Sequence, residues 1–347
     1  YPIKETARLG FSFGVANTEI TTGQYAVQEI MASPRLNEDY DWYQTTRNSD
    51  GTYSAIETLN PVSDLPPSYQ VAPPAGPGFL DENGDEFLNW TMTGSWSEST
   101  LNRGRMATRG ASQTFALEVS APAISDLEFF KVTYDAQVFY PVPFLKTWTL
   151  RLRTELGYGD GYGDTTGLPF YENYFAGGFG SVRGYESNTL GPRSTPAEQY
   201  SVGQPITEID SEGNPTQIGG PNGNEFGYIA SDGQLLYQQI DNDNDPFGGN
   251  ILIEGGAELL FPLPFIKDQS QLRTSFFLDA GNVFDTDCGP LQTSCNNLDF
   301  GELRYSVGVG LTWVTAFGPM SFSLAKPLNS GEYDEEEIFQ FTLGRGF

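Results

Sequence analysis

The sequence predicts an all-β protein, a transmembrane antiparallel β-barrel with long outer loops, on three observations. Apolar and polar residues alternate with period two in about ten separate segments, the pattern of strands whose two faces meet different surroundings. Most of these segments run to about ten residues, enough to cross a bilayer at a tilt, whereas strands of soluble sandwiches usually have about five or six. The connections between the segments alternate between short and long. Together these features favour a membrane barrel over a soluble sandwich.

The first five expected strands each separate apolar from polar residues. The polar face of the fifth carries Arg151, Arg153 and Glu155, so it suits a wet lumen while the apolar face suits lipid. The ranges and their apolar residues are 7–15 (Leu9, Phe11, Phe13, Val15), 87–97 (Leu88, Trp90, Met92, Trp96), 113–121 (Phe115, Leu117, Val119), 129–140 (Val132, Tyr134, Val138, Tyr140) and 148–158 (Leu150, Leu152, Leu156, Tyr158).

After a long gap, five more strands repeat the pattern. Their polar faces include Glu254, Glu258, Arg273, Asp279 and Arg304. The ranges and their apolar residues are 251–261 (Ile251, Ile253, Ala257, Leu259, Phe261), 272–280 (Leu272, Phe276, Leu278), 303–313 (Leu303, Tyr305, Val307, Val309, Leu311, Trp313), 320–326 (Phe322, Leu324) and 338–347 (Phe339, Phe341, Leu343).

The connections favour an outer-membrane barrel in particular, because such barrels have short periplasmic turns and long outer loops. The long connections are rich in Gly, Pro, Asn and acidic residues. The opening residues 1–3 resemble another short turn, so we expect a strand before them and read the chain as part of a mature protein. The short connections are 142–146, 263–269 and 316–320, and the long ones are about 21–85, 162–248 and 285–302.

Composition excludes several classes of function. The chain has 45 acidic and 18 basic residues, a formal charge of -27, which argues against binding nucleic acid. It has no histidine, so Ser-His and His-Asp mechanisms are excluded. Glu254 and Glu258 share a strand face and could form a catalytic dyad, but inward arginines such as Arg151 make ion pairs the better reading. We therefore expect neither an enzyme nor a cofactor.

Two loop features leave alternatives open. Cys288 and Cys295 form either a short loop disulfide, which fits an oxidising compartment, or two free thiols, and they are too few for a zinc site. The acidic segment 240–250 hints at calcium, but Pro246 and Leu252 stand where an EF-hand needs glycine and a bidentate acid. A solvated acidic loop without metal is the favoured interpretation.

The glycine-rich stretch GGFGSVRGYESNTLGP, residues 177–192, lies inside the long connection 162–248. Its glycines are spaced GxGxxxG instead of GxGxxG, no P-loop lysine follows, and no parallel αβ pattern surrounds it. A nucleotide site is therefore excluded.

Residues 157–192, with Val182, Arg183, Gly184 and Tyr185 at their centre, resemble the VRGF/Y segment of the BamA outer-membrane-protein assembly factors. The similarity continues through three further segments, at 273–285, 316–327 and 339–347. It implies that residues 1–347 are part of a sixteen-strand barrel in the outer membrane of a Gram-negative bacterium. Relative to the family, the POTRA domains and about six N-terminal strands are absent.

The resemblance also implies a function and its residues. The family folds and inserts other barrel proteins, the loop over 162–248 would fold into the lumen, and Arg183 would be held there by Glu258 and Asp279. The barrel would open laterally beside its last strand. Clients would be unfolded outer-membrane proteins, with BAM lipoproteins, bound mainly through POTRA domains, the lipid bilayer and lipopolysaccharide as further partners. The residues implied for the seam and the C-terminal signal are Phe339, Phe341, Gly344 and Phe347.

Three other functions stay open at this point. A TamA-like or two-partner-secretion transporter has a related motif, a passive porin would need an open lumen, and a histidine-free enzyme would need Glu254 or Glu258.

Overall fold

The computed structural model describes the chain except for residues 22–41, 48–52, 60–77, 105, 146, 195–205, 210–214, 219–224, 230–234, 240–244, 264–265, 267–270, 289–291, 293, 316 and 345–347. The chain divides into two compact units. The first comprises Tyr1–Glu19, Glu86–Arg193 and Pro246–Phe347, and the second comprises Ile20–Asp85 and Ser194–Asp245.

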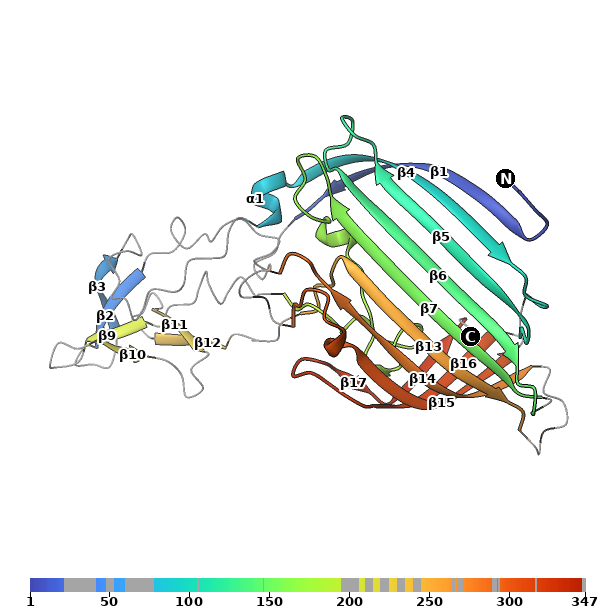
Figure 1. Ribbon diagram of the computed structural model, residues 1–347. Helices are drawn as coiled ribbons and strands as arrows, with labels where there is room; N and C mark the ends of the chain where they lie inside the picture. Colours follow the sequence, from blue (N-terminus) through green and yellow to red (C-terminus); the bar gives the residue numbers. More distant parts are fainter. Residues whose placement is uncertain are drawn as a thin grey trace. The chain divides into compact units, whose positions relative to one another are not determined.

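The first unit is built on one antiparallel sheet of ten strands, which Figure 1 shows curving from β1 at the top to β15 at the bottom. Each strand pairs with the next strand of the sheet along the chain, so β1 and β18 are its two edges. In order across the sheet the strands are β1 (Ala7–Glu19), β4 (Glu86–Ser99), β5 (Gly110–Ser120), β6 (Phe129–Pro141), β7 (Thr149–Gly161), β13 (Ile251–Phe261), β14 (Leu272–Phe284), β15 (Arg304–Thr315), β16 (Gly318–Pro327) and β18 (Phe339–Leu343).

All ten predicted strands are present, but several ends differ from the prediction. β1 continues beyond residue 15 to Glu19, because Asn17 and Glu19 still pair through their backbones with Leu88 and Glu86 of β4. Pairing needs only backbone groups, so it outlasts the side-chain alternation from which the end was predicted.

Within the described residues, which end at Gly344, the last strand is shorter than predicted: β18 covers Phe339–Leu343, and the prediction was 338–347. Gly344 follows with a φ of 89°, a left-handed conformation that takes the backbone out of the strand. Phe347 lies outside the described residues.

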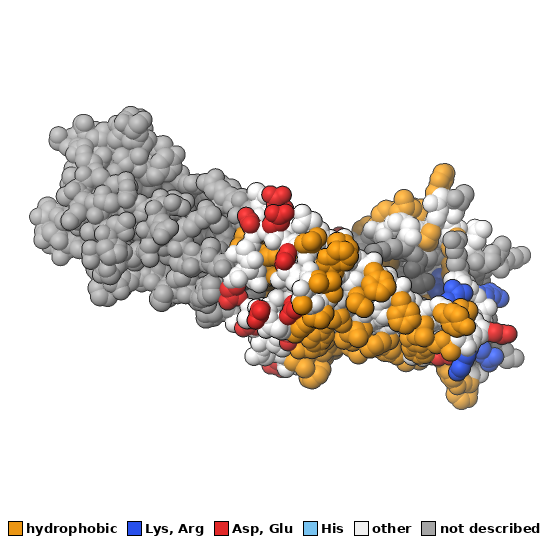
Figure 2. Space-filling view, turned by 90° about the horizontal axis from the view of Figure 1, so that it is seen from above, with side chains coloured by type: hydrophobic (Ala, Val, Ile, Leu, Met, Phe, Trp, Pro, Cys, Tyr) orange, Lys and Arg blue, Asp and Glu red, His pale blue; other side chains and the backbone are white. Residues whose placement is uncertain are grey.

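The outer face of the sheet is apolar. Phe11, Phe13 and Trp313 are 77%, 80% and 50% exposed, an arrangement that only an apolar surrounding would stabilise. Figure 2 shows such side chains as an orange band, with acidic side chains at one end and Lys and Arg at the other. Within the described residues, no helix is both long and apolar enough to cross a membrane.

The inner face is covered by the segment that follows β7. Ala176, Val182, Tyr185 and Leu190 are buried against Leu252 of β13 and Val283 of β14. The connection predicted over 162–248 is therefore divided: its part up to Arg193 belongs to the sheet's unit, and Ser194–Asp245 belongs to the second.

The second unit contains short strands that the sequence analysis read as loop. Four of them form a sheet in the order β10-β9-β2-β3, where β2 and β9 pair in parallel, and β11 pairs with β12. One short helix, α1 (Phe79–Asn83), precedes β4. The strands of this unit are β2 (Trp42–Arg47), β3 (Tyr53–Leu59), β9 (Ile206–Ile209), β10 (Pro215–Ile218), β11 (Glu225–Ile229) and β12 (Leu235–Gln239).

Candidate functional site

The glycine-rich stretch forms a tight turn on the inner face of the sheet. Gly177 and Gly178 have φ values of 104° and 94°, which other residues rarely adopt. The turn is closed by Ser181, whose Oγ accepts a hydrogen bond from the Gly177 N–H at 2.8 Å and donates one to Glu254. Arg153 of β7 donates to the Gly180 carbonyl oxygen at 3.0 Å, so a strand of the sheet binds the turn directly.

Arg183 follows this turn and is held by Glu258 and Asp279, the two carboxylates that the resemblance to the BamA family implied. Its Nε and Nη2 atoms bind the two Asp279 carboxylate oxygens at 2.6 and 3.0 Å, and Nη2 lies 2.6 Å from Glu258 Oε1. Its guanidinium carbon is 3.5 Å from the ring centre of Phe277. Arg183 is 1% exposed and both acids 0%. A planar guanidinium with two-point contacts fixes orientation as well as charge.

Two further arginines complete the buried arginine cluster, which we define as Arg151, Arg153, Arg183, Glu258 and Asp279. Arg151 Nη1 lies 3.3 Å from Glu258 Oε2, and Arg153 Nη2 lies 3.0 Å from Asp279 Oδ1. Each acid thus lies between the motif arginine and an arginine of β7. Buried charges persist only when paired in this way, because an isolated ion away from water is strongly disfavoured.

Electrostatics keep Arg183 charged. Burial by itself would lower the pKa of its guanidinium, but the adjoining carboxylates of Asp279 and Glu258 outweigh burial and raise that pKa. Arg183 therefore stays a cation throughout the physiological pH range.

The other motif residues contact different strands. Gly184 has a φ of 95°, and a Cβ there would lie 3.1 Å from the Ala325 Cβ of β16. The Tyr185 hydroxyl donates to the carbonyl oxygens of Tyr305, at 3.2 Å, and Asn329. The motif thus joins β13 and β14, through Arg183, to β15 and β16, through Gly184 and Tyr185.

Known proteins share this chain's sequence and fold. A family model described as the Omp85 superfamily domain matches residues 1–347. The chain belongs to the Omp85 superfamily. The outer membrane protein assembly factor BamA of Neisseria meningitidis serogroup B is 33% identical over 288 residues, covering 78% of this chain and 30% of that protein. BamA of Neorickettsia risticii is 33% identical over 100 residues, 29% of this chain and 13% of that protein.

A solved structure agrees with these relatives. The crystal structure of BamA from Haemophilus ducreyi, lacking POTRA domains 1-3, superimposes with a TM-score of 0.54 at 28% identity, covering 74% of this chain and 42% of that one. The predicted fold class and the resemblance to the BamA family are therefore confirmed. This Omp85 domain is a β-barrel domain of a Gram-negative outer membrane, and it spans less than half the length of the relatives it matches.

The three predicted seam residues that the structure describes lie on or next to the last described strand of this Omp85 domain. Phe339 and Phe341 point outward, 55% and 50% exposed, and the Phe341 ring centre lies 5.0 Å from that of Phe322 on β16. β18 pairs with β16 over five residue pairs, whereas β15 and β16 share ten. Gly344 ends the strand, and its N–H donates to the Pro319 carbonyl oxygen at 2.8 Å.

The two candidate dyad residues have different partners. Glu258 belongs to the buried arginine cluster, and Glu254 accepts from the Ser181 hydroxyl. Within the part of the chain that the structure describes, no three Cys, Asp or Glu side chains are placed to hold a metal. Residues 240–244 of the acidic segment lie outside that part.

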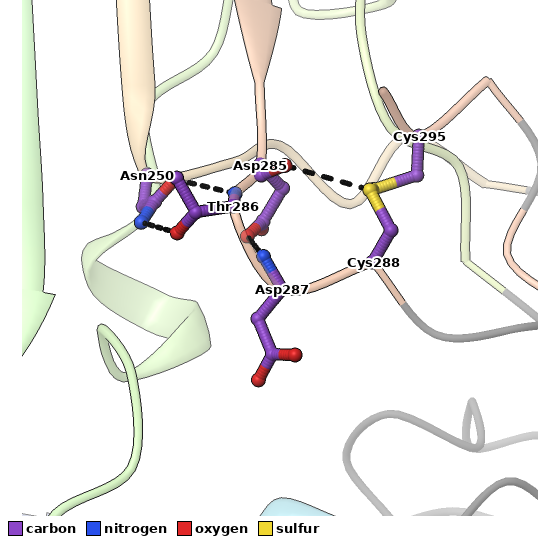
Figure 3. Close-up of a disulfide and its surroundings, with 6 residues drawn as sticks. All are labelled: Asn250, Asp285, Thr286, Asp287, Cys288 and Cys295. Atoms are coloured by element: carbon purple, nitrogen blue, oxygen red, sulfur yellow. Dashed lines mark hydrogen bonds between the residues drawn. A yellow bond between two sulfur atoms is a disulfide. The ribbon is translucent and has the colours of Figure 1, made fainter. Parts of the chain in front are cut away.

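Cys288 and Cys295 form a disulfide in the connection after β14, with their Cα atoms 5.6 Å apart (Figure 3). The start of this connection is bound to Asn250, whose Nδ2 donates to Thr286 Oγ1 at 2.7 Å and whose Oδ1 accepts from the Thr286 N–H at 3.1 Å. The connection is therefore bound, two residues before Cys288, to Asn250, the residue that precedes β13.

Opening the disulfide should affect this connection more than the barrel. The cysteines close a loop with a sequence separation of 7. Closing so short a loop restricts the unfolded chain by about 2 kcal/mol. We expect a variant with both cysteines replaced by serine to lose no more than that in urea unfolding. Reducing the wild-type protein should have the same effect, and a loss of barrel circular dichroism at 25 °C would contradict the expectation.

The same connection should depend on pH through Asp285, the first residue after β14. Burial raises the pKa of its carboxyl from 3.8 to about 6, although its Oδ1 accepts a hydrogen bond from the Asp287 N–H at 3.0 Å. Between about pH 4 and pH 6, the Asp285 carboxyl is therefore protonated in the folded loop but ionised in the unfolded chain. This contribution to stability is complete below about pH 4 and is lost as the pH rises through about 6.

We expect protease to cut this connection faster at pH 8 than at pH 5, after correction for the pH dependence of the protease itself. Asp285→Asn should remove the difference, and Asp164→Asn in another outer connection should leave it. Equal pH dependence in wild type and Asp285→Asn would show that another group is responsible.

Proposed function

We propose that this chain is the membrane barrel of an outer-membrane assembly factor, which promotes folding and insertion of other β-barrel proteins. The buried arginine cluster is the observation that carries the proposal, because it anchors the VRGY loop inside a barrel whose relatives are named assembly factors. Since the chain spans 30% of the Neisseria relative, the activity of the whole protein is inferred from the part that contains this anchor.

The last strand is the proposed place of action. Within the described residues, β18 is an edge of the sheet with five residue pairs to its neighbour, and an edge strand offers free backbone N–H and C=O groups to another strand. A client strand would pair there, and the outward aromatic residues Phe339 and Phe341 would keep the seam in lipid. The step exchanges hydrogen bonds only, so it requires no catalytic residue, cofactor or nucleotide.

Unfolded outer-membrane proteins are the proposed clients. The proposal includes a BAM complex with its lipoproteins, bound mainly through POTRA domains, and contact with the bilayer and lipopolysaccharide through the apolar outer face. Backbone pairing at an edge is largely independent of side chains, which suits a factor that handles many client sequences.

A reconstitution experiment tests the function. The intact protein is placed in liposomes, an unfolded barrel client is added from urea, and protease-resistant inserted client is followed over time. We expect faster insertion than in protein-free liposomes of the same lipid. Equal rates in the two preparations would end the proposal.

The same preparation separates the alternatives. A porin would give steady ion conductance, which is disfavoured because the motif segment fills the inner side of the sheet with buried residues such as Tyr185 and Leu190. A TamA-like or two-partner-secretion transporter would move a soluble client across the liposome membrane without inserting it. Hydrolysis that disappears in Glu254→Gln or Glu258→Gln would indicate an enzyme.

A further inference from the structure

A two-residue strand pair connects the motif to the chain just before the last strand. β8 (Gly184–Tyr185) pairs with β17 (Glu336–Glu337), and the Glu186 N–H donates to the Glu335 carbonyl oxygen at 2.8 Å. Only Ile338 separates β17 from β18, and its carbonyl oxygen accepts from the Ala325 N–H of β16 at 2.9 Å. The motif backbone therefore reaches the start of the last strand.

Gln340 of β18 makes the closest contact between them. Its Nε2 donates to the Tyr185 carbonyl oxygen at 2.7 Å and to Glu337 Oε2 at 3.1 Å, while its Oε1 accepts from the Gly184 N–H at 3.4 Å. It is 3% exposed, whereas its neighbours Phe339 and Phe341 point outward. A carboxamide has both a donor and an acceptor, so Gln340 binds two backbone groups of the motif at once.

This contact matters because, within the described residues, β18 shares only five residue pairs with β16, against ten between β15 and β16. One further bond follows, from the Gly344 N–H to the Pro319 carbonyl oxygen, where the backbone turns with a φ of 89°. Gly184, in contrast, follows Arg183 directly, and the ion pairs of Arg183 hold it against β13 and β14. Gln340 thus links the most weakly paired strand of the sheet to its most strongly anchored inner segment.

We propose that Gln340 is a positioning residue that couples the last strand to the anchored motif, so that β18 leaves β16 at the cost of its bonds to Gly184 and Tyr185. The inference rests on the proposed function, in which β18 is the place where a client strand pairs. Under this coupling, release of the motif from the sheet raises the equilibrium constant for separation of β18 from β16. Separation of β18 raises the equilibrium constant for release of the motif by the same factor, since coupling between two sites is reciprocal.

Hydrogen exchange of the intact protein in lipid nanodiscs tests the coupling without any client. Gln340→Leu keeps the size of the side chain but removes its two hydrogen-bonding groups. We expect exchange to rise about tenfold in peptides covering β18 and in those covering β8 and β17, and to stay unchanged in β6. Thr342→Val is the matched control, because Thr342 is the other inward residue of the same strand, and it should leave all these rates at the wild-type value.

A second variant separates coupling from ordinary packing. Arg183→Lys keeps the charge but weakens the two-point contact, and by itself it should also raise exchange in β18. If Gln340 transmits the anchor, adding Gln340→Leu to Arg183→Lys should raise β18 exchange by less than the product of the two single effects. Independent, multiplying effects, or no change in β18 in Gln340→Leu, would overturn the proposal.

Client insertion by the same variants distinguishes this inference from the function on which it rests. A faster or slower insertion rate in Gln340→Leu with the predicted exchange pattern supports both. If Gln340→Leu gives the predicted exchange pattern but the wild-type protein inserts no client, the coupling is supported and the proposed function is rejected. Normal insertion together with unchanged exchange would reject the coupling alone.

Discussion

Arg183→Ala should release the motif segment from the inner face of the sheet and impair assembly of other barrel proteins. The substitution removes one of the positive charges beside Glu258 and Asp279, both of which are 0% exposed in the wild type. Breaking a buried pair by removing one partner usually costs about 3–5 kcal/mol. We expect the lower end, because Arg151 and Arg153 remain 3.3 and 3.0 Å from the two acids.

Two measurements check this expectation. Limited proteolysis should cut between Gly177 and Arg193 in Arg183→Ala under conditions where the wild type is intact, and outer-membrane barrel proteins should fall in cells that carry the variant. Arg109→Ala, at an exposed turn, is the control and should change neither. Arg183→Ala with a protease-resistant loop and normal barrel levels would show that the ion pairs do not anchor the segment.

The two acids should differ in effect. Asp279 accepts three hydrogen bonds from Arg183, two from the guanidinium and one from the backbone N–H, whereas Glu258 is joined to Arg183 by a single ion pair. Asp279→Asn should therefore loosen the segment more than Glu258→Gln, and the same proteolysis experiment compares them.

Most of the fold could be predicted from the sequence, because alternation with period two is a local signal and every strand of the ten-stranded sheet carries it. The inward position of Glu258 and Asp279 followed from that alternation. Their pairing with Arg183 did not, since Arg183 lies in an irregular segment where no period fixes direction. It came from the resemblance of residues 182–185 to a known motif.

The features that could not be predicted from the sequence involve very short strands, or residues whose partners lie far away in the sequence. β8 and β17 contain two residues each, too few for any periodicity, so Gln340 could be placed on the inner face but its contact with the motif could not be foreseen. Strands β2 and β9 pair in parallel although Glu86–Arg193 of the first unit lies between them in the sequence, and their segments have the composition of loops rich in turn-forming residues. Arg153 binds Asp279 as well as Arg183 does, and this contact depends on how β7 and β14 are aligned on the two sides of β13. Alternation within a strand does not fix that alignment.

Gly256→Ala should disturb the anchor almost as strongly as Arg183→Ala, although it changes no charge. Gly256 pairs with Asp279 on one side and Arg153 on the other, and a Cβ there would lie 2.5 Å from Asp279 Oδ1 and 2.9 Å from Arg153 Nε. Asp279 Oδ1 would therefore have to shift, and this is the atom that accepts from Arg183 Nη2 at 3.0 Å. We expect a loss of about 1–3 kcal/mol from this overpacking, measured by urea unfolding and by proteolysis of the motif segment.

The adjacent glycine is a matched control for that change. A Cβ on Gly255, on the opposite face of β13, would meet only the Arg153 carbonyl oxygen at 3.5 Å, an ordinary contact. Alanine in place of a strand glycine restricts the unfolded chain, so Gly255→Ala should be neutral or stabilising by up to about 1 kcal/mol. If Gly256→Ala lowers the free energy of unfolding and Gly255→Ala does not, the loss at Gly256 comes from crowding of the buried arginine cluster, because strand propensity acts on both positions equally. The same small effect at both would mean that Asp279 can shift while Arg183 stays bound, and the anchor would then be looser than its distances imply.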